Sequence, residues 1–122
     1  MAANAPPKVG NPSFAIVASN APRSSAGFCV ASDVQDLTGS DPLFLGITLQ
    51  IGILSATELH GFPIVSDPSG AAFAPAPIPN NPALAGKTFY VQSFWVQAPG
   101  MTCSPAVAAL VSSRGLSVTL QP

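Results

Sequence analysis

The sequence predicts an all-β protein, a two-sheet antiparallel β-sandwich of the jelly-roll or Ig-like type with seven to eight strands. Three observations support this prediction. Short runs of β-branched and aromatic residues recur along the chain, 14 prolines and 10 glycines punctuate it, and almost no stretch has the apolar spacing of an amphipathic helix. Short strands divided by turn residues are typical of sandwiches and jelly rolls.

The chain of 122 residues has the length of a single domain. Residues 1–12 are rich in Ala, Asn and Pro, and their prolines disfavour a helix. We therefore expect an extended N-terminal arm over residues 1–12, followed by one β-sandwich domain over residues 13–122.

The expected strands are, in order, residues 13–19, 28–32, 43–54, 58–65, 71–78, 88–97, 106–111 and 116–120, with one helical turn as the alternative for 106–111. The first is apolar on both faces, and the second is short and contains Cys29. The run 43–54 contains Gly46 and Gly52, and glycines inside a strand often mark a bend. Its length predicts a strand that curves from one sheet into the other.

Prolines suggest that the next two strands lie at sheet edges. Gly61 and Pro63 interrupt the run 58–65, which therefore fits an edge or two short pieces. In the run 71–78, prolines two residues apart remove hydrogen-bond donors from one side of the strand only. Such a strand can still pair on its other side.

The run 88–97 is the strongest strand candidate, because it combines β-branched residues with the only Trp and the only Tyr of the chain. Both of its faces are largely apolar, as in a central strand. Before it, residues 80–86 can form one helical turn, with Pro82 at the first position and Gly86 at the end. After it, the run 116–120 places its apolar residues on one face.

Charge is scarce throughout the chain. Charged residues make up 7% of it, against roughly a quarter in ordinary soluble domains. The net charge is −1 and the four basic residues lie far apart, so we expect no nucleic acid partner. The longest apolar run, 43–54, is too short to cross a bilayer and contains Thr48 and Gln50, so we expect no membrane span.

The two cysteines, Cys29 and Cys103, are too far apart for a CxxC redox motif or a zinc ribbon. We predict a structural disulfide between them, with two buried thiols as the alternative. The disulfide would close a loop of about 75 residues and contribute roughly 3–4 kcal/mol on the chain-entropy model. Because disulfides persist in oxidising compartments, this pairing predicts a secreted or cell-surface protein.

No catalytic signature is present, so we expect neither an enzyme nor a bound cofactor. His60 is the only histidine, which excludes a Ser-His-Asp triad or a multi-histidine metal site within one chain. Glu58 lies on the same strand face, where a polar surface pair is the alternative to a catalytic pair. The aspartates Asp33, Asp36 and Asp41 resemble a loose calcium loop but miss the EF-hand spacing, and a solvated turn is the alternative to a cation site.

Three rings in the strongest strand, Tyr90, Phe94 and Trp95, are candidates for stacking on a sugar. Rings in such an apolar strand more often belong to the core, which is the alternative. If they are exposed, the protein is a non-catalytic carbohydrate-binding or adhesion module, our second functional hypothesis.

The first functional hypothesis follows from the missing charge. Natural sheets protect their edges with charges, prolines or bulges, whereas Glu58 and Lys87 are nearly alone in or beside the strand-like runs. We predict a homo-oligomer or polymer, a structural subunit that self-assembles into a fibre, sheath or layer through sheet-edge and apolar-face pairing. The arm over residues 1–12 is a candidate strand for a neighbour's sheet. A monomer kept soluble by Ser, Thr, Asn and Gln is the alternative.

The segment 77–97, PIPNNPALAGKTFYVQSFWVQ, resembles a module found at the C-terminal ends of secreted, poorly characterised bacterial proteins. In that module, IPN(D/N)PALxG leads into an aromatic strand, and a SNGLxVTI-like strand ends it. Residues 112–120, SSRGLSVTL, are similar to this ending, although Arg114 stands where Asn is usual. The opening GNPSF at 10–14 and the turn DPSG at 67–70 also fit. The resemblance implies a secreted β-sandwich without known catalytic residues.

Overall fold

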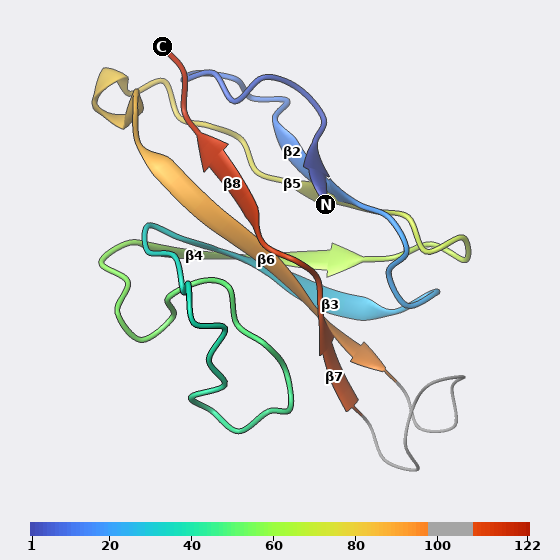
Figure 1. The fold of residues 1–122 in the computed structure, drawn as a ribbon. Helices are drawn as coiled ribbons and strands as arrows, with labels where there is room; N and C mark the ends of the chain where they lie inside the picture. The colour runs from blue at the N-terminus through green and yellow to red at the C-terminus, as the bar shows by residue number, and fades with distance from the viewer. Residues whose placement is uncertain (98–108) are drawn as a thin grey trace.

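Two antiparallel sheets make up the computed structural model, which describes residues 1–97 and 109–122. The three-stranded sheet contains, in spatial order, β1 (Ala2–Ala3), β2 (Ala15–Ala18) and β5 (Ala72–Pro75). The five-stranded sheet contains, in spatial order, β4 (Leu59–Val65), β3 (Ala26–Ser32), β6 (Thr88–Gln97) and β7 (Ala109–Ser112), and β8 (Leu116–Thr119) also pairs with β6. The predicted two-sheet antiparallel β-sandwich is confirmed (Figure 1).

Strand β6 is the centre of the larger sheet, because it is paired on both sides and covered on both faces. β3 lies along one side, and β7 and β8 share the other. Every residue from Val91 to Trp95 is buried. Val91 and Trp95 face the smaller sheet, whereas Phe94 faces away from it. The run 88–97 is therefore the central strand that its two apolar faces predict.

The main core lies between the two sheets. It is built from inward-facing side chains of both sheets, and its buried members are Phe14, Ile16, Ala18, Cys29, Ala31, Ile64, Ala72, Ala74, Ile78, Val91, Trp95, Val118 and Leu120. Burying one large apolar side chain stabilises a fold by about 1.5–3 kcal/mol. With so little charge in the chain, this burial is the principal source of stability.

A short 3₁₀ helix, η1 (Pro82–Leu84), precedes β6. Asn81 caps it, since its side-chain oxygen accepts a hydrogen bond from the backbone N–H of Ala83 at 3.0 Å. Pro82 occupies the first turn, and Gly86 follows with a φ of 83°, a conformation that glycine adopts without strain. The predicted helical turn within residues 80–86 is confirmed.

Part of the expected N-terminal arm belongs to the smaller sheet of its own chain. Ala2 and Ala3 pair with Val17 and Ile16 of β2. Further along, the backbone N–H of Val9 donates to the carbonyl of Gln121 at 2.8 Å. Residues 1–12 thus place hydrogen bonds within the domain, and β1 covers the edge of β2 that a neighbouring chain would otherwise meet.

The predicted strand over residues 43–54 is wrong. A long loop, residues 33–58, joins β3 to β4, and within it Ile51 makes only an isolated bridge. The backbone enters the left-handed region at Phe44 (φ 53°) and Gly46 (φ 73°), which breaks an extended strand. Figure 1 shows this loop, teal to green, projecting from the lower left, away from β2 and β5.

The apolar alternation within this loop nevertheless has a structural role. Ile47, Leu49 and Ile51 are buried against Val30 and Phe94, and together they form an outer cluster on the face of the larger sheet that points away from the smaller one. The loop therefore covers this face by side-chain packing, without pairing to it as a strand.

The buried side chain of Gln92 fixes the loop onto the larger sheet. Its oxygen accepts the backbone N–H of Gln50 at 2.9 Å. Its amide nitrogen donates to the carbonyl of Thr48 at 2.8 Å and to that of Ser113, before β8, at 2.9 Å. One amide group therefore satisfies three backbone groups from two separate segments.

We expect Gln92→Leu to lower the free energy of unfolding by about 2–4 kcal/mol, because buried backbone groups left without a partner cost about 1–3 kcal/mol each. Leucine keeps the burial but neither donates nor accepts. Chemical denaturation followed by Trp95 fluorescence measures the change.

Gln35→Leu is the matched control, since the Gln35 side chain is exposed. It should change the free energy of unfolding by less than about 0.5 kcal/mol. Equal effects of the two substitutions would contradict the anchoring role of Gln92.

Candidate functional site

Two of the three candidate stacking rings belong to the interior. Trp95 is 3% exposed within the main core, and Phe94 is 1% exposed within the outer cluster. Phe94 stacks on Phe28 with ring centroids 5.2 Å apart. Tyr90 is half-buried and lines a hollow of about 380 Å³ together with Gln50. Of the three rings, the structure places only Tyr90 within reach of a ligand.

Cys29 lies in the main core with no exposed surface, and no cysteine among the described residues is bonded to it. Burial raises the pKa of this thiol, and a hydrogen bond from the Ser93 hydroxyl, 3.6 Å from the sulfur, lowers it by a smaller amount. Cys103 lies outside the described residues. The disulfide between Cys29 and Cys103 stays a prediction.

The three loop aspartates, Asp33, Asp36 and Asp41, each organise a turn and do not converge on one point. Asp33 joins the two ends of the loop, since its carboxylate accepts the backbone N–H groups of Thr57 and Glu58 at 3.0 and 3.1 Å. Among the described residues, no group of three or more His, Cys, Asp or Glu is placed to hold a metal ion. The structure therefore does not assemble the candidate cation site.

Hydrogen bonding lowers the pKa of two of these carboxyl groups. The largest cause is the Thr57 hydroxyl for Asp33 and the Ser40 hydroxyl for Asp36. Donors that bond to the charged form of a carboxyl group favour that form. Both carboxylates are therefore charged at neutral pH, and both stabilise the loop in this state.

Asp41 holds residues 43–45, here called the apolar tip, which contain the most exposed large apolar side chain among the described residues. Its carboxylate accepts the backbone N–H groups of Leu45 and Gly46 at 2.9 and 2.8 Å. Within the tip, Phe44 is 93% exposed and has a positive φ of 53°. A non-glycine residue in this conformation is uncommon, and such strain persists only where its surroundings enforce it.

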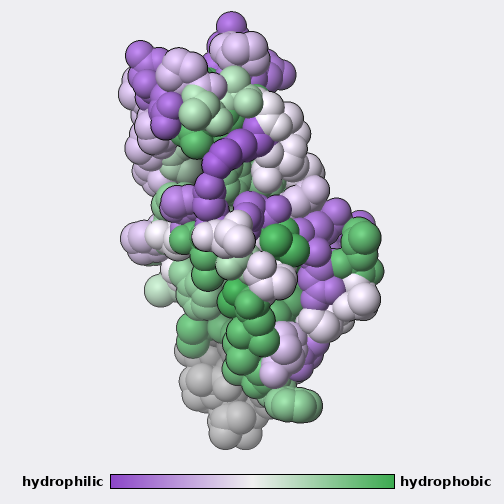
Figure 2. All heavy atoms as spheres, turned by 90° about the vertical axis from the view of Figure 1, so that its left-hand side faces the viewer, coloured by the Kyte–Doolittle hydropathy of each residue, from purple (hydrophilic) through white to green (hydrophobic). Residues whose placement is uncertain are grey.

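Exposed apolar side chains concentrate on the same loop. Of the ten large hydrophobic residues exposed in the described part of the chain, five lie between residues 33 and 58, namely Leu37, Leu43, Phe44, Leu45 and Leu54. Figure 2 shows hydrophobic residues gathered over the lower half of one face, whereas the upper half is mostly hydrophilic. Contiguous exposed apolar surface in a soluble protein usually marks an interaction site.

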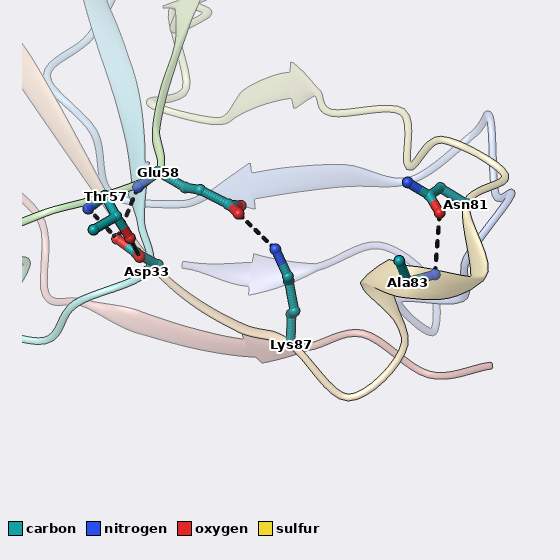
Figure 3. Close-up of polar contacts among 6 residues, drawn as sticks. All are labelled: Asp33, Thr57, Glu58, Asn81, Ala83 and Lys87. Atoms are coloured by element: carbon teal, nitrogen blue, oxygen red, sulfur yellow. Dashed lines mark hydrogen bonds and ion pairs between the residues drawn. The ribbon is translucent and has the colours of Figure 1, made fainter.

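Glu58 is the last residue of the loop 33–58, and His60 lies in β4. Glu58 forms an ion pair with Lys87, just before β6 (Figure 3). His60 is exposed, and its ring meets that of Phe89 edge-on at 5.9 Å. The partner that the structure gives Glu58 is thus Lys87, and the partner that it gives His60 is Phe89.

Beside these residues, a cavity of about 420 Å³ opens between the two sheets. Ile16 of the smaller sheet and Val91 of the larger one both line it. Thirteen of its 16 lining residues are apolar, and the polar ones are Glu58, His60 and Asn81. The lining is therefore mainly apolar, and its three polar residues are half-buried or exposed, as residues at the rim of an open cavity are.

Sequence reasoning missed the apolar tip and the cavity. A signal for the tip was present, because Asp41, Pro42 and Gly46 are turn-forming residues that compete with the strand-like run. No comparable signal exists for the cavity, whose lining comes from segments far apart in the chain.

We expect Cys29 to react with iodoacetamide at least about tenfold more slowly in the folded protein than in urea, with no reductant present in either case. Burial blocks access of the reagent to the sulfur and disfavours the reactive thiolate. Mass spectrometry of the Cys29 peptide measures the labelling. If labelling after unfolding also needs a reductant, the thiol is bonded, as the predicted disulfide requires.

We expect acid to loosen the loop 33–58 before the sandwich unfolds. The folded pKa values of Asp33 and Asp36 lie below the unfolded value of about 3.9, so their stabilisation is present above that pH and is lost as pH falls through the folded values. Amide hydrogen exchange of Thr57, whose N–H donates to Asp33, should show less protection at about pH 2 than at about pH 6 after correction for intrinsic rates. The Thr38 amide, which donates to Asp36, should lose its protection only in stronger acid, because the pKa of Asp36 is lowered further. Unchanged protection would contradict this expectation.

In the described parts of the chain, no helix is both long and apolar enough to cross a membrane. In comparisons with known proteins, no family model, no curated protein and no solved structure matches this chain. The resemblance to the bacterial C-terminal module accordingly stays a prediction.

Proposed function

We propose that this chain is a secreted or cell-surface structural subunit that self-associates through its apolar tip and its uncharged sheets. One observation carries the proposal, the 93% exposure of Phe44 at a tip that Asp41 holds in a fixed conformation. A large apolar ring held in water is unfavourable, and a second copy of the chain removes it from water on association.

The apolar tip contributes to the affinity between copies, but a stable interface also needs the surface around the tip. Burying one Phe ring contributes about 1.5–3 kcal/mol, whereas a stable interface buries at least about 1,000 Å² in total. Leu37 and Leu54, which are 85% and 72% exposed on the same loop, extend the apolar surface. We infer that the loop 33–58 forms the centre of the contact.

The strands also favour self-association, because none of the described strands contains Lys, Arg, Asp or Glu. Inward-pointing or edge charges normally oppose the pairing of one sheet with another. Only Pro63 within β4 and Pro75 at the end of β5 reduce the number of edge donors. Electrostatic repulsion therefore does little to prevent contact between copies.

The extracellular location rests on two supports, the predicted disulfide and the resemblance described above. A rigid subunit without charged strands suits a fibre, sheath or layer, in which each copy contacts several others. The carbohydrate-binding alternative gains no comparable support, because Phe94 and Trp95 are buried and leave Tyr90 as the single accessible ring of the three candidates.

We expect Phe44→Ser to weaken self-association about tenfold or more, since the ring contributes about 1.5–3 kcal/mol to an interface that buries it. Analytical ultracentrifugation over a range of concentrations measures the association constant, and negative-stain microscopy shows whether filaments or layers form.

Phe73→Ser is the matched control, because Phe73 is 54% exposed on β5, in the other sheet. It should change the association constant by less than about threefold. A wild-type protein that stays monomeric at high concentration would refute the proposal. Equal losses for the two variants would show that the apolar tip is not the centre of the contact.

A further inference from the structure

We propose that the cavity between the sheets binds a compact, largely apolar, uncharged molecule that carries one hydroxyl group, such as an aromatic or terpenoid alcohol. This binding activity is separate from self-association, because the cavity lies between the sheets and the apolar tip lies on the outer loop.

The size and lining of the cavity define the apolar part of the ligand. Its volume of about 420 Å³ falls within the range of about 300–1,000 Å³ typical of small-molecule sites. Phe14, Phe62, Phe89 and Leu84 are among the apolar residues that line it. An apolar space of this size gives water few hydrogen-bond partners, so an apolar molecule displaces it favourably.

The rim defines the polar part of the ligand. Figure 3 shows Glu58 paired with Lys87 and, apart from this pair, Asn81 beside η1. The Asn81 oxygen is directed at Ala83, and its amide nitrogen points away from that bond. Glu58 offers a carboxylate acceptor, and Asn81 offers an amide donor. A hydroxyl group is the small uncharged group that can donate to the first or accept from the second.

Charge at the rim disfavours ions. Glu58 lines the cavity, so an anionic ligand would be repelled by its carboxylate. Lys87, which would otherwise attract an anion, is already paired with Glu58. Lys87 does not line the cavity, and because it already balances the Glu58 charge, that carboxylate attracts a cationic ligand less than a free one would. An uncharged ligand therefore fits better than a fatty acid or an amine.

Isothermal titration calorimetry with 1-naphthol tests the proposal, with 1-naphthoate as the anionic counterpart of similar size. For a ligand this small we expect a Kd of about 10 µM to 1 mM for 1-naphthol and at least about tenfold weaker binding of 1-naphthoate. Repeating the titration with the Phe44→Ser variant separates ligand binding from self-association, and the Kd should not change there.

Two variants locate the site. Ala31→Leu places a larger side chain at the cavity wall and should weaken 1-naphthol binding about tenfold or more, whereas Ala71→Leu, in an exposed turn, should leave the Kd unchanged. If Ala31→Leu does not fold, as judged by circular dichroism, Ala76→Leu at the half-buried rim of the same cavity replaces it.

Glu58→Gln tests the charge argument, because it keeps an oxygen acceptor and removes the negative charge. We expect it to reduce the preference for 1-naphthol over 1-naphthoate by about threefold or more. Absence of 1-naphthol binding at about 1 mM, equal binding of both probes, or binding that the cavity variants leave intact would each overturn the proposal.

Discussion

The side-chain amide of Gln92 is the interaction on which the outer half of this protein depends. It lies on the face of the central strand that points away from the smaller sheet. No second sheet covers this face within the described residues. Because an amide carries both a donor and an acceptor, it serves the backbone of Gln50, Thr48 and Ser113 much as a strand edge would. The loop 33–58 can therefore cover Phe94 without belonging to the sheet.

The distribution of charge divides the molecule into two kinds of structure. The described strands have no Lys, Arg, Asp or Glu, and apolar burial between the sheets holds them together. The loop 33–58, in contrast, is shaped by the carboxylates of Asp33, Asp36 and Asp41, each bonded to backbone N–H groups nearby. Within the described residues, the charges of these three aspartates fix the loop, whereas the strands contain no charged residue.

The two proposed binding features follow from this division. The apolar tip is convex, because the Asp41 carboxylate holds Leu45 in a turn that projects Phe44 into solvent. The cavity is concave, because the two sheets do not close completely beside the Glu58–Lys87 pair. A convex apolar group suits a contact with another macromolecule, whereas an apolar hollow of this volume suits a small molecule.

The sequence by itself determined the elements that a local signal specifies, such as two apolar faces of one strand or a proline and a glycine in a turn. The run 88–97 reads as a central strand because both of its faces are apolar, and the turn ending at Gly86 reads as a turn because proline and glycine restrict the backbone locally. The run 43–54 could not be assigned in the same way. Its alternating Ile47, Leu49 and Ile51 are buried, as they would be in a strand. They pack on the sheet without pairing to it, because the backbone of Gln50 bonds the side chain of Gln92, which lies 42 positions later in the chain. The cavity and the buried positions of Phe94 and Trp95 were likewise decided only by the tertiary structure, because they require surfaces from distant segments to meet, and a local pattern carries no information about that meeting.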